Sequence, residues 1–188
     1  GTSLATASRI KRAAKRIAES KKSGMEVVVV VSAMGKSTDQ LLKLAGQVSM
    51  YPDTRELDIL LSTGELVSST LLAMALSSRG QTAISLSGLQ AGIWTDTTYG
   101  KARIARIDTK RVEKELRSGK VVIVAGFQGT TETMDVTTLG RGGSDLTAVA
   151  LAAALKAERC EIYTDVDGVY SSDPNKIISF IFLDNLFH

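Results

Sequence analysis

The sequence predicts an α/β protein, arranged as a three-layer α/β/α sandwich around a mainly parallel sheet. The valine run within Glu26–Val31 and the apolar run Val121–Ala125 are typical of strands covered on both faces. Helical periodicities stand between such runs, and glycine-rich loops follow them. Because open sheets of this class bind ligands at the carboxyl ends of their strands, we expect the site in those loops.

Periodicity and turn residues define the expected elements along the chain. In the first half these are a helix over Ser3–Lys22, a strand over Glu26–Val31, a loop over Ser32–Lys36, a helix from Thr38 or Asp39 to Gln47, helices over Thr54–Leu61 and Glu65–Arg79, and a strand over Thr82–Leu86. In the second half they are a loop over Ser87–Gly100, a strand over Arg103–Ile107, a helix over Thr109–Arg117, a strand over Val121–Ala125, a hairpin over Thr130–Thr138, a helix over Leu146–Leu155 and a strand over Glu161–Thr164. Ser62 and Thr63, just before Glu65, fit either a helix cap or a substrate role.

Composition narrows the kinds of chemistry that the chain supports. It has 188 residues, a net charge of +3, and a single cysteine and a single histidine, Cys160 and His188. One cysteine allows no disulfide within the chain and no cysteine-based zinc site, and we expect Cys160 to be buried at a strand entry. One terminal histidine argues against histidine-based acid–base catalysis. With no signal-peptide pattern and no apolar run near the ~20 residues that span a bilayer, we expect a cytoplasmic protein without membrane contact.

Positive charge is concentrated in the first predicted helix. Nucleic acid is one partner that such a cluster can bind, but aromatic stacking residues are scarce and no recognition motif accompanies it. We therefore predict a solvated helix face and no nucleic-acid partner. The basic residues are Arg9, Lys11, Arg12, Lys15, Arg16, Lys21 and Lys22.

The stretch Gly140–Asp145, followed by the apolar run Leu146–Leu155, has the pattern of an anion site at a helix start. Glycines free the backbone, and the first N–H groups of a helix point at the ligand together with the positive end of the helix dipole. Arg141 adds a planar fork for a carboxylate or a phosphate. Ser144 or Asp145 fits as the helix cap. A glycine-rich turn before a capped helix is the simpler alternative.

Two other loops contain partial matches to known motifs. Gly35-Lys36-Ser37 ends like a P-loop, but Val30 stands where that motif needs a glycine, so we reject it. Asp165–Tyr170 contains an Asp-Gly turn signal and lacks the spacing of an EF-hand. A turn that presents groups to a nucleotide fits this segment better, and a structural hairpin is the alternative. No metal-ligating cluster is predicted.

Several short motifs follow one another along the chain in a specific order. They are Gly1-Thr2-Ser3, Ser32-Ala33-Met34-Gly35, Ser62-Thr63-Gly64-Glu65, Gly126-Phe127-Gln128-Gly129, Gly140-Arg141-Gly142-Gly143-Ser144-Asp145, and Tyr163-Thr164-Asp165-Val166-Asp167-Gly168-Val169-Tyr170 followed by Asp173-Pro174. In this order they resemble the aspartate kinase family, whose catalytic domain has the amino acid kinase fold. The resemblance implies a partial catalytic domain over residues 1–176 and a divergent tail over residues 177–188.

The resemblance implies an ATP-dependent kinase that phosphorylates the side-chain carboxylate of L-aspartate, with Mg²⁺, in the first step of lysine, threonine and methionine biosynthesis. It also implies a homo-oligomeric intact enzyme. A carboxylate with a reference pKa of about 3.9 is already ionised at neutral pH, so the nucleophile needs no general base. Cations and main-chain N–H groups must then stabilise the charge on the transferred phosphoryl group.

Matching the family motifs residue by residue assigns roles to this chain. Aspartate and the transferring phosphate would lie against Ser32, Thr38, Glu65, Arg141, Gly142, Gly143 and Ser144. ATP would lie against Gly1, Thr2, Ser3, Thr164, Asp165, Tyr170, Asp173, Pro174, Asn175 and Lys176. Asp145 would be the catalytic carboxylate that orders lysine side chains. We hypothesise that Glu65 pairs with the substrate ammonium group and that Arg141 clamps its α-carboxylate.

The sequence departs from the family at both ends. Family members begin with a strand and a Lys-Phe-Gly-Gly run, of which this chain has only the last glycine, and the later lysine and the ACT domains are also lacking. We therefore expect impaired catalysis by residues 1–188 and an exposed sheet edge. Other kinases of this fold, which act on acetylglutamate, glutamate, carbamate or UMP, are the near alternative, and a non-catalytic nucleotide or amino-acid binding module is another.

Replacing Arg141 with alanine tests the proposed carboxylate clamp. Loss of the bidentate contact should raise the KM for aspartate by about tenfold, equivalent to ~1.4 kcal/mol, as measured by steady-state kinetics. An unchanged KM would refute the clamp.

Overall fold

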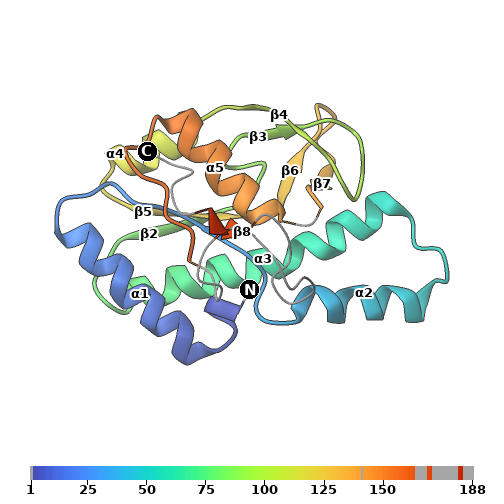
Figure 1. Ribbon diagram of the computed structural model, residues 1–188, viewed down its shortest axis with the longest axis horizontal. Coiled ribbons are helices and arrows are strands. Elements are labelled where there is room, and N and C mark those ends of the chain that lie inside the picture. The colour runs from blue at the N-terminus through green and yellow to red at the C-terminus, as the bar shows by residue number, and fades with distance from the viewer. Residues whose placement is uncertain (1, 141, 164–168, 171–181, 184–188) are drawn as a thin grey trace.

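A parallel sheet lies between two layers of helices, as the sequence predicts (Figure 1). The computed structural model describes residues 2–140, 142–163, 169–170 and 182–183. Its helices are α1 (Ala7–Lys22), α2 (Ser37–Val48), α3 (Thr54–Ser77), α4 (Lys110–Arg117) and α5 (Gly143–Leu155), with a short 3-10 helix (Thr2–Leu4) before α1. Its strands are β1 (Val28–Val31), β2 (Ala83–Leu86), β3 (Ile93–Thr95), β4 (Ile104–Ile107), β5 (Val121–Ala125), β6 (Gln128–Thr130), β7 (Val136–Thr138), β8 (Val169–Tyr170) and β9 (Phe182–Leu183).

Strand β5 is the centre of the parallel sheet, which has the order β1-β5-β2. Each of its residues is buried, as expected for a strand covered on both faces. Val121 and Ile123 pack with α1 and α3, whereas Val122 and Val124 pack with α4 and α5. The alternation of side chains along one strand therefore joins two apolar cores.

A second, mixed sheet with the order β4-β3-β6-β7 stands at one end of the domain. The predicted hairpin over Thr130–Thr138 is confirmed as the antiparallel pair β6 and β7. The prediction of a continuous loop over Ser87–Gly100 is wrong, because β3 lies within it. A strand of three residues is too short to show alternation in the sequence. In the structure, the Arg106 guanidinium on β4 lies over the Trp94 ring of β3, 4.2 Å from the ring centroid.

The two helices predicted around Ser62–Gly64 form one continuous helix, α3. The Ser62 hydroxyl donates to the Ile59 carbonyl at 2.8 Å and the Thr63 hydroxyl to the Leu60 carbonyl at 2.7 Å. These bonds return to the preceding turn, so neither hydroxyl caps a helix and the capping interpretation is wrong.

Helix α3 begins after Asp53, whose carboxylate accepts hydrogen bonds from the backbone N–H groups of Arg55, at 3.0 Å, and Glu56, at 3.1 Å. As one helix, α3 is long and apolar enough to cross a membrane, and it is the one described helix of which this is true. The sequence analysis expected no apolar run near 20 residues because it divided α3 into two shorter helices. Helix α3 packs on α1 and the parallel sheet through Leu72 and Leu76, as core helices do, and it also buries two acidic side chains, Asp58 and Glu65.

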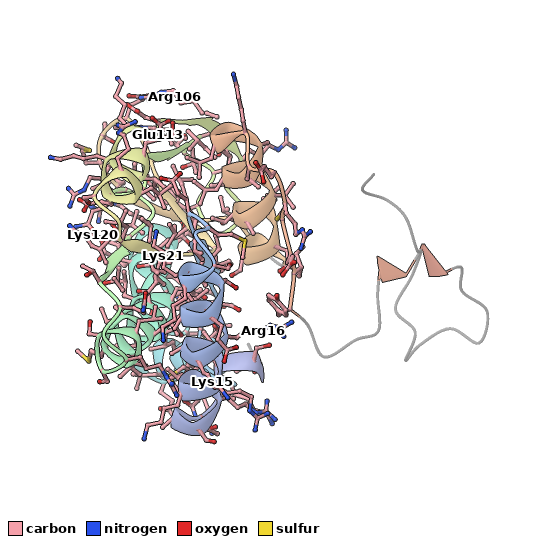
Figure 2. The ribbon with its side chains drawn as sticks, turned by 90° about the vertical axis from the view of Figure 1, so that its left-hand side faces the viewer. Lys15, Arg16, Lys21, Arg106, Glu113 and Lys120 are labelled. Atoms are coloured by element: carbon pink, nitrogen blue, oxygen red, sulfur yellow. The ribbon has the colours of Figure 1, made fainter. Side chains whose placement is uncertain are left out.

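Other differences concern the ends of elements. Helix α1 begins after Thr6, whose hydroxyl accepts from the Arg9 N–H, instead of at Ser3. The described part of the predicted strand over Glu161–Thr164 is irregular, and Cys160 beside it is exposed, so both of those predictions are wrong. The basic side chains of α1 are exposed and lie away from its buried residues Ile10, Ala14 and Ala18, except for Lys21, which is half-buried. Figure 2 shows Lys15, Arg16 and Lys21 along this helix.

The start of α3 can be tested by comparing two exposed positions. Asp53→Ala removes the cap and should lower the free energy of unfolding by about 1 kcal/mol, measured by urea titration. The control Thr63→Ala removes an exposed methyl group and a hydroxyl that bonds within the helix, and it should leave stability nearly unchanged or slightly raised. An equal or larger loss at Thr63 would contradict the continuous helix.

Candidate functional site

The site is centred on the buried carboxylate of Glu65, which α3 carries past the end of β1. Its Oε1 accepts a hydrogen bond from the Ala33 N–H at 3.0 Å, and Glu65 is only 3% exposed. Within the described part of the chain, its Oε2 is buried without a hydrogen-bond partner. Burial raises the pKa of Glu65 from its ordinary value of 4.5 to about 6. A buried oxygen of this kind is suited to a cationic group, which would restore the lost interaction.

Close backbone contact brings α3 to the loop after β1. A Cβ atom on Gly64 would lie 2.9 Å from the Cβ of Ala33, so a larger residue would push the helix away. The same loop contains Ser32 and touches the segment before α1, since a Cβ on Gly35 would lie 3.5 Å from the Cβ of Ala5. Two of the predicted motifs, together with the N-terminal segment, therefore meet around Glu65.

A second close contact joins β5 to β1 and α5. A Cβ atom on Gly126 would lie 2.8 Å from Cγ1 of Val30 and 3.0 Å from both Cβ and Oγ of Ser144. Ser144 in the first turn of α5 is therefore at the carboxyl ends of two neighbouring parallel strands. This is the rim at which the sequence places the site.

The glycine-rich stretch forms the start of α5, but not with the predicted cap. Gly142 occupies the N-cap with φ +75°, a left-handed conformation that favours glycine, and it makes no side-chain cap bond. Ser144 and Asp145 follow inside the first turn, so the prediction that one of them caps the helix is wrong. The free N–H groups of a first helical turn are consequently available to an anion.

Thr147 ties this turn to the end of β5. Its hydroxyl donates to the Gly143 carbonyl at 2.7 Å and accepts the Phe127 N–H at 3.2 Å. Phe127 itself has φ +64°, which is uncommon for a residue other than glycine. The two loops are thus held by one buried side chain that sequence reasoning missed.

The segment at Ser3 that is predicted to bind ATP lies beside Tyr163, which begins the motif of the second such segment, although the two residues are 160 positions apart in the sequence. The Ser3 hydroxyl donates to the carbonyl of Tyr163 at 3.3 Å, and the guanidinium of Arg16 lies 4.4 Å from the centroid of the Tyr163 ring. Figure 2 shows Arg16 on the side of α1 where this segment passes. The predicted N-terminal nucleotide segment therefore lies beside the residue that precedes Thr164.

Glu65 contacts the loop that contains Ser32, and Ser144, which follows Gly143 in the first turn of α5, lies beside Gly126 and Val30 at the ends of β5 and β1. Thr38 lies in the first turn of α2, Thr2 and Ser3 form the 3-10 helix, and Asp145 is exposed in the first turn of α5. Tyr170 lies in β8, and its side chain is outside the description. The other predicted site residues lie outside the described residues: Gly1, Arg141, Thr164, Asp165, Asp173, Pro174, Asn175 and Lys176. In residues 2–140 and 142–163, no three His, Cys, Asp or Glu side chains gather.

Buried polar side chains around the rim also escaped sequence reasoning. Gln128 donates from Nε2 to the Ser62 carbonyl at 3.0 Å and accepts the Gly88 N–H at 3.3 Å. Asp58 bonds to two distant backbone segments. An acidic residue inside the apolar run 57–61 is the one signal that pointed to Asp58, because a charge on a core-facing position needs partners.

The chain matches the amino acid kinase family over residues 1–186. It is 58% identical over 179 residues to the aspartokinase of Bacillus sp. (strain MGA3) and 56% identical over 179 residues to aspartokinase 2 of Bacillus subtilis (strain 168), which in each case covers 95% of this chain and 44% of the relative. The chain therefore spans less than half the length of these curated relatives.

Solved structures agree with this fold. The aspartate kinase of Synechocystis is 56% identical, with a TM-score of 0.77 over 93% of this chain and 29% of that one. E. coli aspartokinase III in complex with aspartate and ADP is 26% identical, with a TM-score of 0.83 over 98% of this chain and 52% of that one. With the layered sheet, the rim of loops and the family match in agreement, the chain belongs to the amino acid kinase family.

Proposed function

We propose that the protein phosphorylates the side-chain carboxylate of L-aspartate with ATP and Mg²⁺, which yields 4-phospho-L-aspartate in the first step of lysine, threonine and methionine biosynthesis. The observation that carries the proposal is the buried Oε2 of Glu65, which lacks a described partner at the rim of the parallel sheet. An amino-acid ammonium group supplies the cation that this oxygen needs. The similarity to aspartokinases, one of them crystallised with aspartate and ADP, supports aspartate as that amino acid.

Glu65 would orient the substrate rather than transfer a proton. Its Oε1 is held by the Ala33 N–H, so Oε2 is aimed by the backbone of the β1 loop and not by a mobile side chain. A carboxylate fixed in this way binds the substrate ammonium group while the side-chain carboxylate of aspartate, already ionised at neutral pH, attacks the terminal phosphate. Arg141 would hold the α-carboxylate.

The first turn of α5 would receive the phosphoryl group. Gly142 is exposed, and apart from its two chain neighbours no described residue lies within 4 Å of the place where its Cβ would stand, so a ligand can approach the backbone. N–H groups and the positive end of the helix dipole favour an anion there. Bound with ATP, Mg²⁺ would supply charge neutralisation on the phosphates, and phosphate oxygens and water would provide most of its ligands.

Several finer expectations remain predictions. The ATP contacts of Thr2, Ser3, Thr164, Asp165 and residues 173–176, and the ordering role of Asp145, belong to the proposal. So do a homo-oligomeric intact enzyme, a cytoplasmic location and the division at residue 176.

A comparison of phosphoryl acceptors tests the function in the full-length protein. ATP consumption should depend on aspartate and not on acetylglutamate, glutamate, carbamate or UMP. Glu65→Gln should raise the KM for aspartate by about tenfold or more and change the KM for ATP less, because the charged partner of the ammonium group is lost. Glu115→Gln is the matched control, since Glu115 on α4 is also buried but pairs with Arg111 on the same helix and with Lys120 just before β5. Equal effects of the two variants would contradict the assignment of Glu65.

The raised pKa of Glu65 also predicts how stability depends on pH. A carboxyl whose pKa is about 6 in the folded state and 4.5 when unfolded stabilises the fold below pH 4.5, and this contribution disappears as the pH rises through 6. Without substrate, Glu65→Gln should therefore exceed the wild type in unfolding free energy at pH 7.5 by up to about 2 kcal/mol, and by much less at pH 4. Urea titrations at the two pH values measure this difference. If the two proteins differed in unfolding free energy by the same amount at both pH values, burial of the Glu65 charge would not be the cause of the difference.

A further inference from the structure

Asp58 is a buried carboxylate that the proposed chemistry leaves without a role. It lies on α3, it is 1% exposed, and no lysine or arginine pairs with it among the described residues. Its partners are hydrogen-bond donors instead. Gly100 donates its N–H at 3.0 Å to both oxygens, Thr138 donates its N–H at 2.8 Å to Oδ2, and the Thr138 hydroxyl donates at 2.7 Å to Oδ1.

These donors belong to two backbone segments that lead into the glycine-rich stretch. Thr138 ends β7 and stands two residues before Gly140, and its carbonyl accepts the Ala102 N–H at 2.8 Å. The turn at Gly100 also borders Gly140, where a Cβ atom would lie 3.5 Å from the Gly100 carbonyl oxygen. Leu139, which stands between Thr138 and Gly140, donates its N–H to the Phe127 carbonyl at 2.9 Å. The bonds of Asp58 therefore extend directly to the loop that begins α5.

Asp58 and Glu65 share one face of the same helix. They are seven residues apart, which is about two helical turns and roughly 10 Å along the axis. Glu65 meets the end of β1, whereas Asp58 holds the strand that enters the glycine-rich loop. The continuous helix α3 thus connects the two halves of the rim as a rigid spacer.

We propose that Asp58 is a positioning residue that fixes the segment Thr138–Gly140, which enters the glycine-rich stretch, relative to Glu65, so that the ammonium group and the anionic groups of one substrate are bound at a set separation. The proposal rests on the proposed function, in which these two elements contact the same molecule. A carboxylate suits this task because hydrogen bonds to a charged acceptor are shorter and stronger than those to a neutral one. An apolar side chain would fill the space but accept a hydrogen bond from none of the three donors.

The experiment compares variants of the full-length protein. Both oxygens of Asp58 accept hydrogen bonds. In Asp58→Asn an NH₂ group replaces one of these oxygens, so two hydrogen-bond donors face each other there. We expect kcat/KM for aspartate to fall roughly ten- to hundredfold, because the loop is displaced from the reacting groups. Thr138→Val, which loses one donor and keeps the backbone bond, should give a smaller loss, and Thr138→Ser should restore the wild-type value.

A control separates positioning from simple loss of stability. Val112→Ala removes buried apolar volume on α4, away from the rim, and should lower thermal stability while leaving kcat/KM unchanged. Hydrogen exchange supplies a second readout. In Asp58→Asn the amides of Leu139 and Gly143 should exchange faster, while those of β1 and β5 keep the protection seen in the wild type.

The outcomes are distinct. If Asp58→Asn loses stability as Val112→Ala does but keeps kcat/KM and loop protection, Asp58 is only structural and the proposal is overturned. If Asp58→Asn does not fold, the comparison of Thr138→Val with Thr138→Ser decides in the same way. If the wild type phosphorylates no aspartate, the proposed function fails, and faster exchange confined to the loop would still establish that Asp58 holds it.

Discussion

The hydrogen bond from the Ala33 N–H to Glu65 is the contact on which the geometry of the rim depends. It joins the longest helix of the domain to the loop after β1, across 32 positions of sequence. Because Gly64 lets the helix approach this loop, the carboxylate is buried deeply enough to lose its water, and one of its oxygens is left for a ligand. The fold thus holds at its rim a buried carboxylate oxygen whose hydrogen bonding is incomplete in the absence of a ligand.

Around this contact, glycines set the distances between segments and buried polar side chains set their orientation. Gly64 and Gly126 set the distances between segments, because each stands where another residue would collide with its neighbours. Asp58, Gln128 and Thr147 then fix orientation through hydrogen bonds to backbone groups of other segments. Apolar packing on both faces of β5 keeps the frame rigid, so these bonds act between parts that hardly move.

The elements with strong periodic patterns were predictable from the sequence, and the weak ones were not. The apolar run of β5 and the hairpin of β6 and β7 are where the sequence places them. The division of α3 failed because Ser62-Thr63-Gly64 has the composition of a helix boundary, whereas tertiary packing keeps it helical. Motif order predicted roles for Glu65 and Ser144 from the sequence alone, whereas the partners of Asp58, at positions 42 and 80 residues away, follow only from the folded chain.

The contact at Gly126 constrains how the domain can move. With only a hydrogen atom between the β5 backbone, Val30 and Ser144, α5 cannot come closer to the sheet, and lifting it would open a gap along an apolar surface. Displacement along the strands is opposed as well, because the Thr147 hydroxyl accepts the Phe127 N–H and Gly143 packs closely against Phe127 and Leu139. The amino end of α5 is therefore held at one height above the sheet and at one position along it.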